Sequence, residues 1–134
     1  MLVLHRQRPT TTRHIKMPKD SSGAPVILIT GAARRVGAEI ARQLHDAGAR
    51  VALHYRGSAD DAQRLAEGLN ALRPDSAFTV GGDLGHFGVA EDVARAALAR
   101  FDRIDGLVNN ASSFFPTPIG HIDRAAWDDL IGSN

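Results

Sequence analysis

The sequence predicts an α/β fold, a doubly wound parallel sheet with helices on both faces, on the strength of two observations. From Pro25 onward, short apolar runs alternate with stretches of helical periodicity, which is the order of strand–helix–strand units. The first apolar run, 26–29, leads directly into a glycine turn and then into a helix. That arrangement joins a buried strand to a helix packed on the sheet, as this fold class requires.

The expected strands are short apolar runs bounded by glycine, proline or polar residues: 26–30, 50–55, 77–80 and 104–109. The expected helices carry apolar residues at helical spacing: about 35–47, the stretch between Ser58 and Pro74, 89–101, and a last helix capped by Asp123. We expect Ser58 to cap the second helix through its side chain. Apolar stripes that include Val36 in the first helix and Leu72 in the second should face the sheet.

Thr30–Gly37 is the most informative segment, because glycines at 31 and 37 separate the first strand from the first helix. Such a turn leaves backbone N–H groups and a helix N-terminus facing an anion, for example a dinucleotide pyrophosphate. The spacing, Gly-x-x-x-Arg-x-Gly, differs from the common dinucleotide fingerprint. A tight turn that merely needs two glycines is the alternative, but the position between strand and helix favours nucleotide binding.

Only the first half of a complete doubly wound fold is expected, because the sequence given ends after the fourth strand and its helix. Its strands should lie in the order 3-2-1-4, with strand four as an exposed apolar edge. Residues 24–134 are therefore predicted to be the N-terminal part of a dinucleotide-binding Rossmann domain. Residues 1–23 are basic and without periodicity, and we expect a disordered leader; a transit peptide or a nucleic-acid arm is the alternative.

Composition narrows the function classes. The chain has no cysteine, which excludes disulfides and thiolate metal sites and fits a cytoplasmic protein. Six histidines are scattered without ligand spacing, so no metal site is expected. No apolar stretch is long enough to span a membrane. The chain from Asp20 onward is net acidic, which argues against nucleic-acid binding.

The end of the second strand bears on the choice of coenzyme. An acidic residue there would bind a ribose 2′-hydroxyl and select NAD, but the sequence is His54-Tyr55-Arg56-Gly57-Ser58. Arg34 and Arg56 could instead form a fork around a 2′-phosphate, so NADP(H) is the predicted coenzyme. The alternative is that Arg56 is a solvated surface charge.

Two further segments leave the expected carboxyl edge of the sheet. Asp83 and Leu84 follow the third strand, where a carboxylate can accept from an adenine amino group; a turn-forming aspartate explains the residue equally well. The segment 109–118 follows the fourth strand and carries amides, small residues and two phenylalanines. These aromatic rings either stack on a flat ligand or pack beneath the loop.

Taken together, Thr30–Gly37, His54-Tyr55, Asp83-Leu84, Asn110–Phe114 and Pro116-Thr117-Pro118 resemble the short-chain dehydrogenase/reductase superfamily. Within it they are similar to the pteridine reductases, with Arg35 where most members have a central glycine. The resemblance covers about residues 26–134. It implies an NADP(H)-dependent reductase of a pterin such as a dihydropterin or dihydrofolate, a small-molecule substrate, and a homo-oligomeric full-length protein.

The resemblance also assigns roles to individual positions. Coenzyme-binding residues would come from the glycine turn and from the strand ends: Gly31, Arg34, Arg35, Val36, Gly37, His54, Arg56, Ser58, Asp83, Leu84, Asn110, Ala111 and Ser112. Substrate would contact Arg35, Ser112 and Phe114. Asn134 would belong to the catalytic proton relay.

The family's proton-donor pair, a tyrosine four residues before a lysine, is missing from these residues. Tyr55 is the only tyrosine and no lysine follows Lys19, so this chain alone is expected to be inactive. A non-catalytic dinucleotide-binding module and a superfamily reductase acting on a ketone, such as a 3-oxoacyl carrier substrate, are the alternatives.

Overall fold

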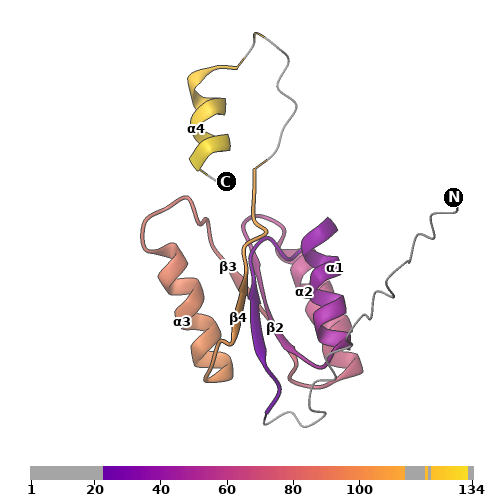
Figure 1. Cartoon of the computed structure of the whole chain (residues 1–134). Coiled ribbons are helices and arrows are strands. Elements are labelled where there is room, and N and C mark those ends of the chain that lie inside the picture. Colours follow the sequence, from indigo (N-terminus) through magenta and orange to yellow (C-terminus); the bar gives the residue numbers. More distant parts are fainter. Residues whose placement is uncertain (1–22, 114–119, 121, 133–134) are drawn as a thin grey trace, which may run out of the picture.

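A computed structural model describes residues 23–113, 120 and 122–132 of the chain. The strands are β1 (Val26–Ile29), β2 (Arg50–Tyr55), β3 (Ala77–Gly81) and β4 (Gly106–Val108). The helices are α1 (Arg35–Asp46), α2 (Ala59–Leu72), α3 (Val89–Phe101) and α4 (Arg124–Gly132). In this part of the chain the strands form one parallel sheet in the order β3-β2-β1-β4, which confirms the predicted half of a doubly wound fold (Figure 1).

Alternate residues of β1 face opposite sides of the sheet and enter two separate cores. Ile29 belongs to the cluster formed with α1 and α2, whereas Val26 and Leu28 belong to the cluster that contains Phe101 of α3. Figure 1 shows α1 and α2 on one side of the sheet and α3 on the other. Both faces are therefore covered, which explains why β1 is a continuous apolar run.

The stripes expected on the first two helices are wrong at one residue each. Val36 is 65% exposed and Leu72 is 74% exposed. In α1 the fully buried face consists of small residues and a histidine: Gly37, Ala38, Ala41 and His45. Small side chains on this face allow the helix to approach the sheet closely, and Val36, in the first turn of the helix, is not part of it.

β4 is shorter than the expected strand 104–109. Its pairing with β1 joins Ile27 to Gly106 and Ile29 to Val108, so the ladder ends where β1 ends. Ile104 lies before the strand and packs against the α3 cluster. Leu107 is 57% exposed, as expected for an edge strand.

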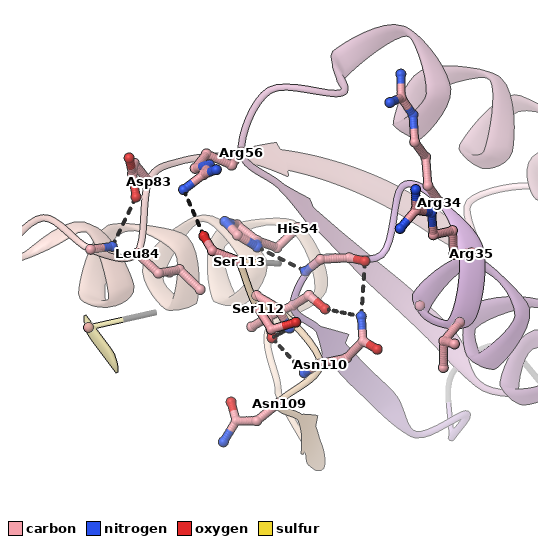
Figure 2. Close-up of a pocket in the computed structure, with 17 residues that line it drawn as sticks. Arg34, Arg35, His54, Arg56, Asp83, Leu84, Asn109, Asn110, Ser112 and Ser113 are labelled. Carbon is pink, nitrogen blue, oxygen red and sulfur yellow. Dashed lines mark hydrogen bonds between the residues drawn. The ribbon is translucent and has the colours of Figure 1, made fainter. Parts of the chain in front are cut away.

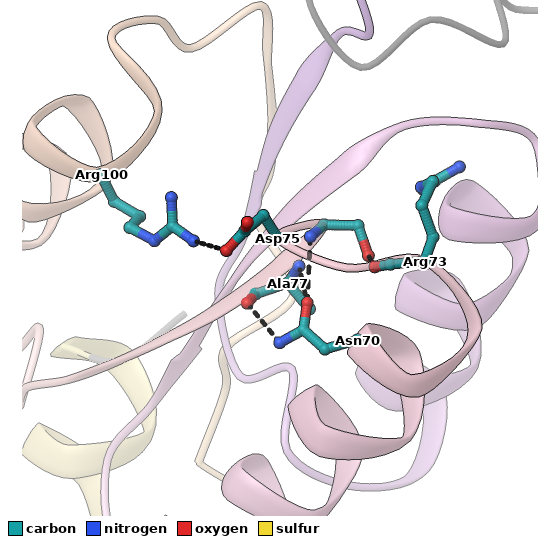
Figure 3. Close-up of polar contacts among 6 residues, drawn as sticks. Asn70, Arg73, Asp75, Ala77 and Arg100 are labelled. Carbon is teal, nitrogen blue, oxygen red and sulfur yellow. Dashed lines mark hydrogen bonds and ion pairs between the residues drawn. The ribbon is translucent and has the colours of Figure 1, made fainter.

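Asn70 fastens the end of α2 to the start of β3 (Figure 3). Its side-chain oxygen accepts hydrogen bonds from the backbone N–H groups of Ser76 and Ala77, and its amide nitrogen donates to the oxygen of Ala77 at 3.0 Å. Arg100 of α3 reaches the same turn and pairs with Asp75 at 2.8 Å. These contacts connect helices from both faces at the amino edge of the sheet.

His45 is buried at this edge. Its Nε2 lies 2.7 Å from the hydroxyl of Ser76, and that hydroxyl donates to the backbone oxygen of Arg73 at 2.5 Å. Because the serine proton is used there, His45 Nε2 carries the proton and donates to the serine oxygen. Burial, followed by the charge of Arg73, lowers the pKa of His45 below its ordinary value.

No helix within the described residues has the length and apolar character needed to cross a membrane. Residues 1–22 of the basic leader and residues 114–119 of the loop that contains Phe114 lie outside the described residues.

Candidate functional site

A cleft of about 650 Å³ opens at the carboxyl edge of the sheet (Figure 2). The chain leaves β3 on one side of β1 and returns in β4 on the other side, so the cleft lies where the strand order reverses. Ligands bind at such switch points in open α/β sheets. Its lining comes from the glycine turn, the segments after β2, β3 and β4, and the end of α4: Thr30, Gly31, Arg34, Arg35, Val36, Gly37, His54, Arg56, Asp83, Leu84, Gly85, Asn109, Asn110, Ala111, Ser112, Ser113 and Gly132.

Thr30 links the glycine turn to the segment after β4 at the base of this cleft. Its hydroxyl accepts hydrogen bonds from the backbone N–H groups of Asn110 and Ala111, both at 2.9 Å, and lies 3.3 Å from the backbone oxygen of Val108. The side chain is buried, and its single oxygen fixes the start of the segment that follows β4. Thr30 was not among the residues predicted to form the site, although it opens the predicted segment Thr30–Gly37.

Asn110 completes the same junction. Its side-chain amide donates to the backbone oxygens of Thr30 and Gly31, each at 3.0 Å. Gly31 has a φ of +62°, and a Cβ there would lie 2.9 Å from Cα of Ala111. A Cβ on Gly37 would lie 2.3 Å from the backbone oxygen of Gly31. Both glycines are thus required by close backbone approach within the protein.

His54 supports the glycine turn from beneath. It is 1% exposed, and its Nδ1 accepts a hydrogen bond from the N–H of Gly31 at 3.3 Å. Its Nε2 lies 2.9 Å from the backbone oxygen of Gly82, so Nε2 carries the proton and donates. Both ring nitrogens are therefore engaged by the protein, and His54 ties the turn to the segment after β3.

Two of the three arginines that line the cleft, Arg34 and Arg56, have separate partners. Arg34 donates through Nε to the carboxylate of Asp61 on α2, and Arg64 reaches the other oxygen of that carboxylate at 2.5 Å. These two hydrogen bonds lower the pKa of Asp61 below its ordinary value. Arg56 instead points across the cleft toward the hydroxyl of Ser113, at 3.5 Å. The cleft is thus lined by one arginine on the β2 side, Arg56, and by two at the start of α1, Arg34 and Arg35 (Figure 2).

Arg35 has a φ of +50°, in the left-handed region that favours glycine. A non-glycine residue at that backbone conformation is strained by about 1 kcal/mol or more. The structure therefore retains a large cationic side chain at a position where glycine would be unstrained. Strain of this kind is typical of functional sites.

Asp83 forms the turn after β3 and also lines the cleft. Its carboxylate accepts a hydrogen bond from the N–H of Gly85 at 3.0 Å and lies 3.6 Å from Nδ1 of His86. The turn-forming interpretation is confirmed by these contacts. Leu84 lies beside it on the cleft wall.

Of the described residues assigned to the site from sequence, all but Ser58 line this cleft. Ser58 occupies the position before α2 but makes no side-chain capping hydrogen bond, so the expected cap is wrong. By contrast, Asp123 accepts a hydrogen bond from the N–H of Ala126 at 2.8 Å, as expected of the cap of α4. Phe114 and Asn134 lie outside the described residues.

Known proteins place the chain in one family. The family model described as short chain dehydrogenase matches residues 25–134, and the chain belongs to that family of oxidoreductases. Pteridine reductase 1 of Leishmania tarentolae is 42% identical over 129 residues, which cover 84% of this chain and 45% of the relative. The 3-oxoacyl-acyl-carrier-protein reductases FabG of Staphylococcus epidermidis and Staphylococcus aureus are each 32% identical over 107 residues, which cover 80% of this chain and 43% of the relative.

The predicted resemblance to short-chain dehydrogenases and to pteridine reductases is thereby confirmed. The chain spans less than half the length of these curated relatives.

Proposed function

We propose that this chain forms the coenzyme-binding half of an NADP(H)-dependent oxidoreductase whose complete form reduces a pterin. The observation that supports this most is the cleft itself, which joins the glycine turn, three arginines and the amide-rich segment after β4 at the switch point of the sheet. Dinucleotides bind at this place in doubly wound sheets.

The residues of the cleft fit the parts of NADP(H). The start of α1 suits the pyrophosphate, because the N-terminus of a helix attracts an anion, whereas the N–H of Gly31 is already taken by His54. Arg34 and Arg56 supply cations for a 2′-phosphate, and no carboxylate ends β2 to favour a 2′-hydroxyl. Asn110 is held rigidly against the turn, which fixes the wall on the nicotinamide side.

NADPH would supply a hydride to the substrate when bound. The residues of this chain would then bind and orient both molecules. Arg35 and Ser112 line the cleft where a pterin could lie over the nicotinamide, and the resemblance assigns Phe114 to the opposite side of the pterin ring. The proton donor implied by the resemblance is not among these 134 residues, so turnover is proposed only for a longer protein.

Coenzyme titrations of the 134-residue chain test the first part of this proposal. We expect NADPH to bind at least about tenfold more tightly than NADH, since a charge-assisted hydrogen bond contributes about 1.5–3 kcal/mol. Arg56→Ala should weaken NADPH binding and leave NADH binding unchanged. Arg95→Ala is the matched control, because Arg95 pairs only with acidic neighbours on α3 within the described residues. Equal affinities for the two coenzymes would refute the NADP(H) assignment.

A ketone substrate is the second candidate, because the staphylococcal relatives are 3-oxoacyl-acyl-carrier-protein reductases. Turnover by a protein that contains this chain together with its carboxyl half separates the two. With NADPH as the reductant, we expect a dihydropterin to be reduced and a 3-oxoacyl thioester to be reduced poorly. The opposite preference would replace the pterin by a ketone without affecting the coenzyme assignment.

A further inference from the structure

Asp61 does not line the main cleft, and among the described residues it contacts that lining through Arg34. The carboxylate is on the first turn of α2, and its side chain is 24% exposed, against 66% for Arg34 and 68% for Arg64. Arg34 lines the main cleft. Asp61 and Arg64 line a different hollow, between α1 and α2. Asp61 therefore reaches a ligand in the main cleft by contact only through Arg34.

The hydrogen bond between Arg34 and Asp61 leaves the two terminal nitrogens of the Arg34 guanidinium available to a ligand. Within the described part of the chain, the guanidinium of Arg34 makes its hydrogen bond through Nε, to Asp61. The terminal nitrogens, which are the donors suited to a phosphate, make no hydrogen bond there. A carboxylate bound at Nε fixes the plane of the guanidinium and keeps this fork directed outward.

An exposed arginine without such a partner samples many rotamers. Ordering a long side chain on ligand binding costs up to about 2 kcal/mol of conformational entropy. A carboxylate on a rigid helix removes much of this cost before the ligand arrives. The two arginines together outweigh the single negative charge, so the cluster remains net positive toward an incoming phosphate.

We propose that Asp61 is a positioning residue for coenzyme selection: it orients Arg34 so that the chain prefers a 2′-phosphate over a 2′-hydroxyl. This inference rests on the proposed NADP(H) binding. The opposing possibility is that Asp61 competes with the phosphate for Arg34, and the two ideas predict opposite effects of removing the carboxylate.

The test compares coenzyme affinities of the 134-residue chain and its variants, with NADPH and NADH as probes. Asp61→Asn removes the charge while retaining the shape. Asp60→Asn is the matched control, because it removes the same charge from the adjacent residue, which forms no ion pair within the described residues. Asp61→Glu restores a carboxylate and provides the rescue. Thermal unfolding checks that each variant is folded.

We expect Asp61→Asn to weaken NADPH binding about fivefold, as the loss of part of the ordering entropy predicts, and to leave NADH binding unchanged. The loss should be largest at about 0.05 M salt and smaller at about 0.3 M salt, since the exposed ion pair that orients Arg34 is itself screened. Asp61→Glu should recover most of the affinity, and Asp60→Asn should behave like the parent.

A double-mutant cycle identifies the route of the effect. In a chain that already carries Arg34→Gln, replacing Asp61 with Asn should no longer change NADPH affinity, because the group that Asp61 orients is absent. The proposal is overturned if Asp61→Asn binds NADPH as tightly as the parent or more tightly, or if its effect is retained without Arg34. A parent chain with no preference for NADPH would overturn both this inference and the NADP(H) assignment.

Discussion

Replacing Thr30 with valine would remove the hydroxyl that joins the glycine turn to the segment after β4, with little change in shape. The hydroxyl accepts from two backbone N–H groups, those of Asn110 and Ala111, at 2.9 Å. Both groups would lose their partner, and a buried N–H without a partner costs about 1–3 kcal/mol. Because Asn110 and Ala111 are only partly buried, we take the low end of that range for each. The expected loss is about 2–3 kcal/mol of unfolding free energy.

Urea denaturation followed by far-ultraviolet circular dichroism measures this loss. Fluorescence is the poorer probe, because Trp127 is the only tryptophan and lies on α4, away from the sheet. Thr30→Ser is the control: it retains the hydroxyl and removes one methyl group, which should cost about 1 kcal/mol or less. If Thr30→Val were as stable as Thr30→Ser, the hydroxyl would not hold this junction and the reasoning would be refuted.

Three other changes test the local geometry by the same denaturation assay. Gly37→Ala should destabilise the chain by about 3 kcal/mol or more, since the added Cβ would lie 2.3 Å from a backbone oxygen. The control is Gly68→Ala on α2, where a Cβ meets open space; it should be neutral or stabilising by about 0.5–1 kcal/mol. Arg35→Gly should raise the free energy of unfolding by about 1 kcal/mol, because glycine adopts a positive φ without strain. A decrease would contradict the interpretation that Arg35 is strained. The pKa of His45 is lowered in the folded chain, so the unfolded chain binds a proton first as the pH falls. The contribution of His45 to the free energy of unfolding should therefore be complete above the unfolded pKa of 6.5 and decline below it. A His45→Gln variant should show a weaker dependence of stability between pH 7.5 and 5, and an unchanged dependence would exclude this histidine as the cause.

The elements of the fold were predictable because their signals are local. Strand–helix alternation, the glycine turn and the carboxylate at Asp123 are all patterns within a few residues. The order 3-2-1-4 followed from the general rule for doubly wound sheets, and the structure has that order. The stripes failed at Val36 and Leu72 because both lie where a helix no longer covers the sheet, and periodicity alone carries no information on where packing stops.

The members of the cleft were also largely predictable, because a parallel sheet brings the carboxyl ends of its strands to one edge. The contacts that each residue makes there were not predictable. His54 belongs to the predicted set, yet both of its ring nitrogens bind the protein backbone. Arg34 and Arg56 were expected to form one fork, and in the structure they have different partners.

By itself the sequence determined the α/β class, the position of the turn at Gly31 and the set of polar residues that gather at one edge of the sheet. Those features depend on residue type and short spacing. Only the tertiary structure decided that Thr30 joins two segments of the cleft and that Asp61 holds Arg34. The partners in these contacts are far apart in the chain, and side chains come within hydrogen-bonding distance only after helices and sheet have packed.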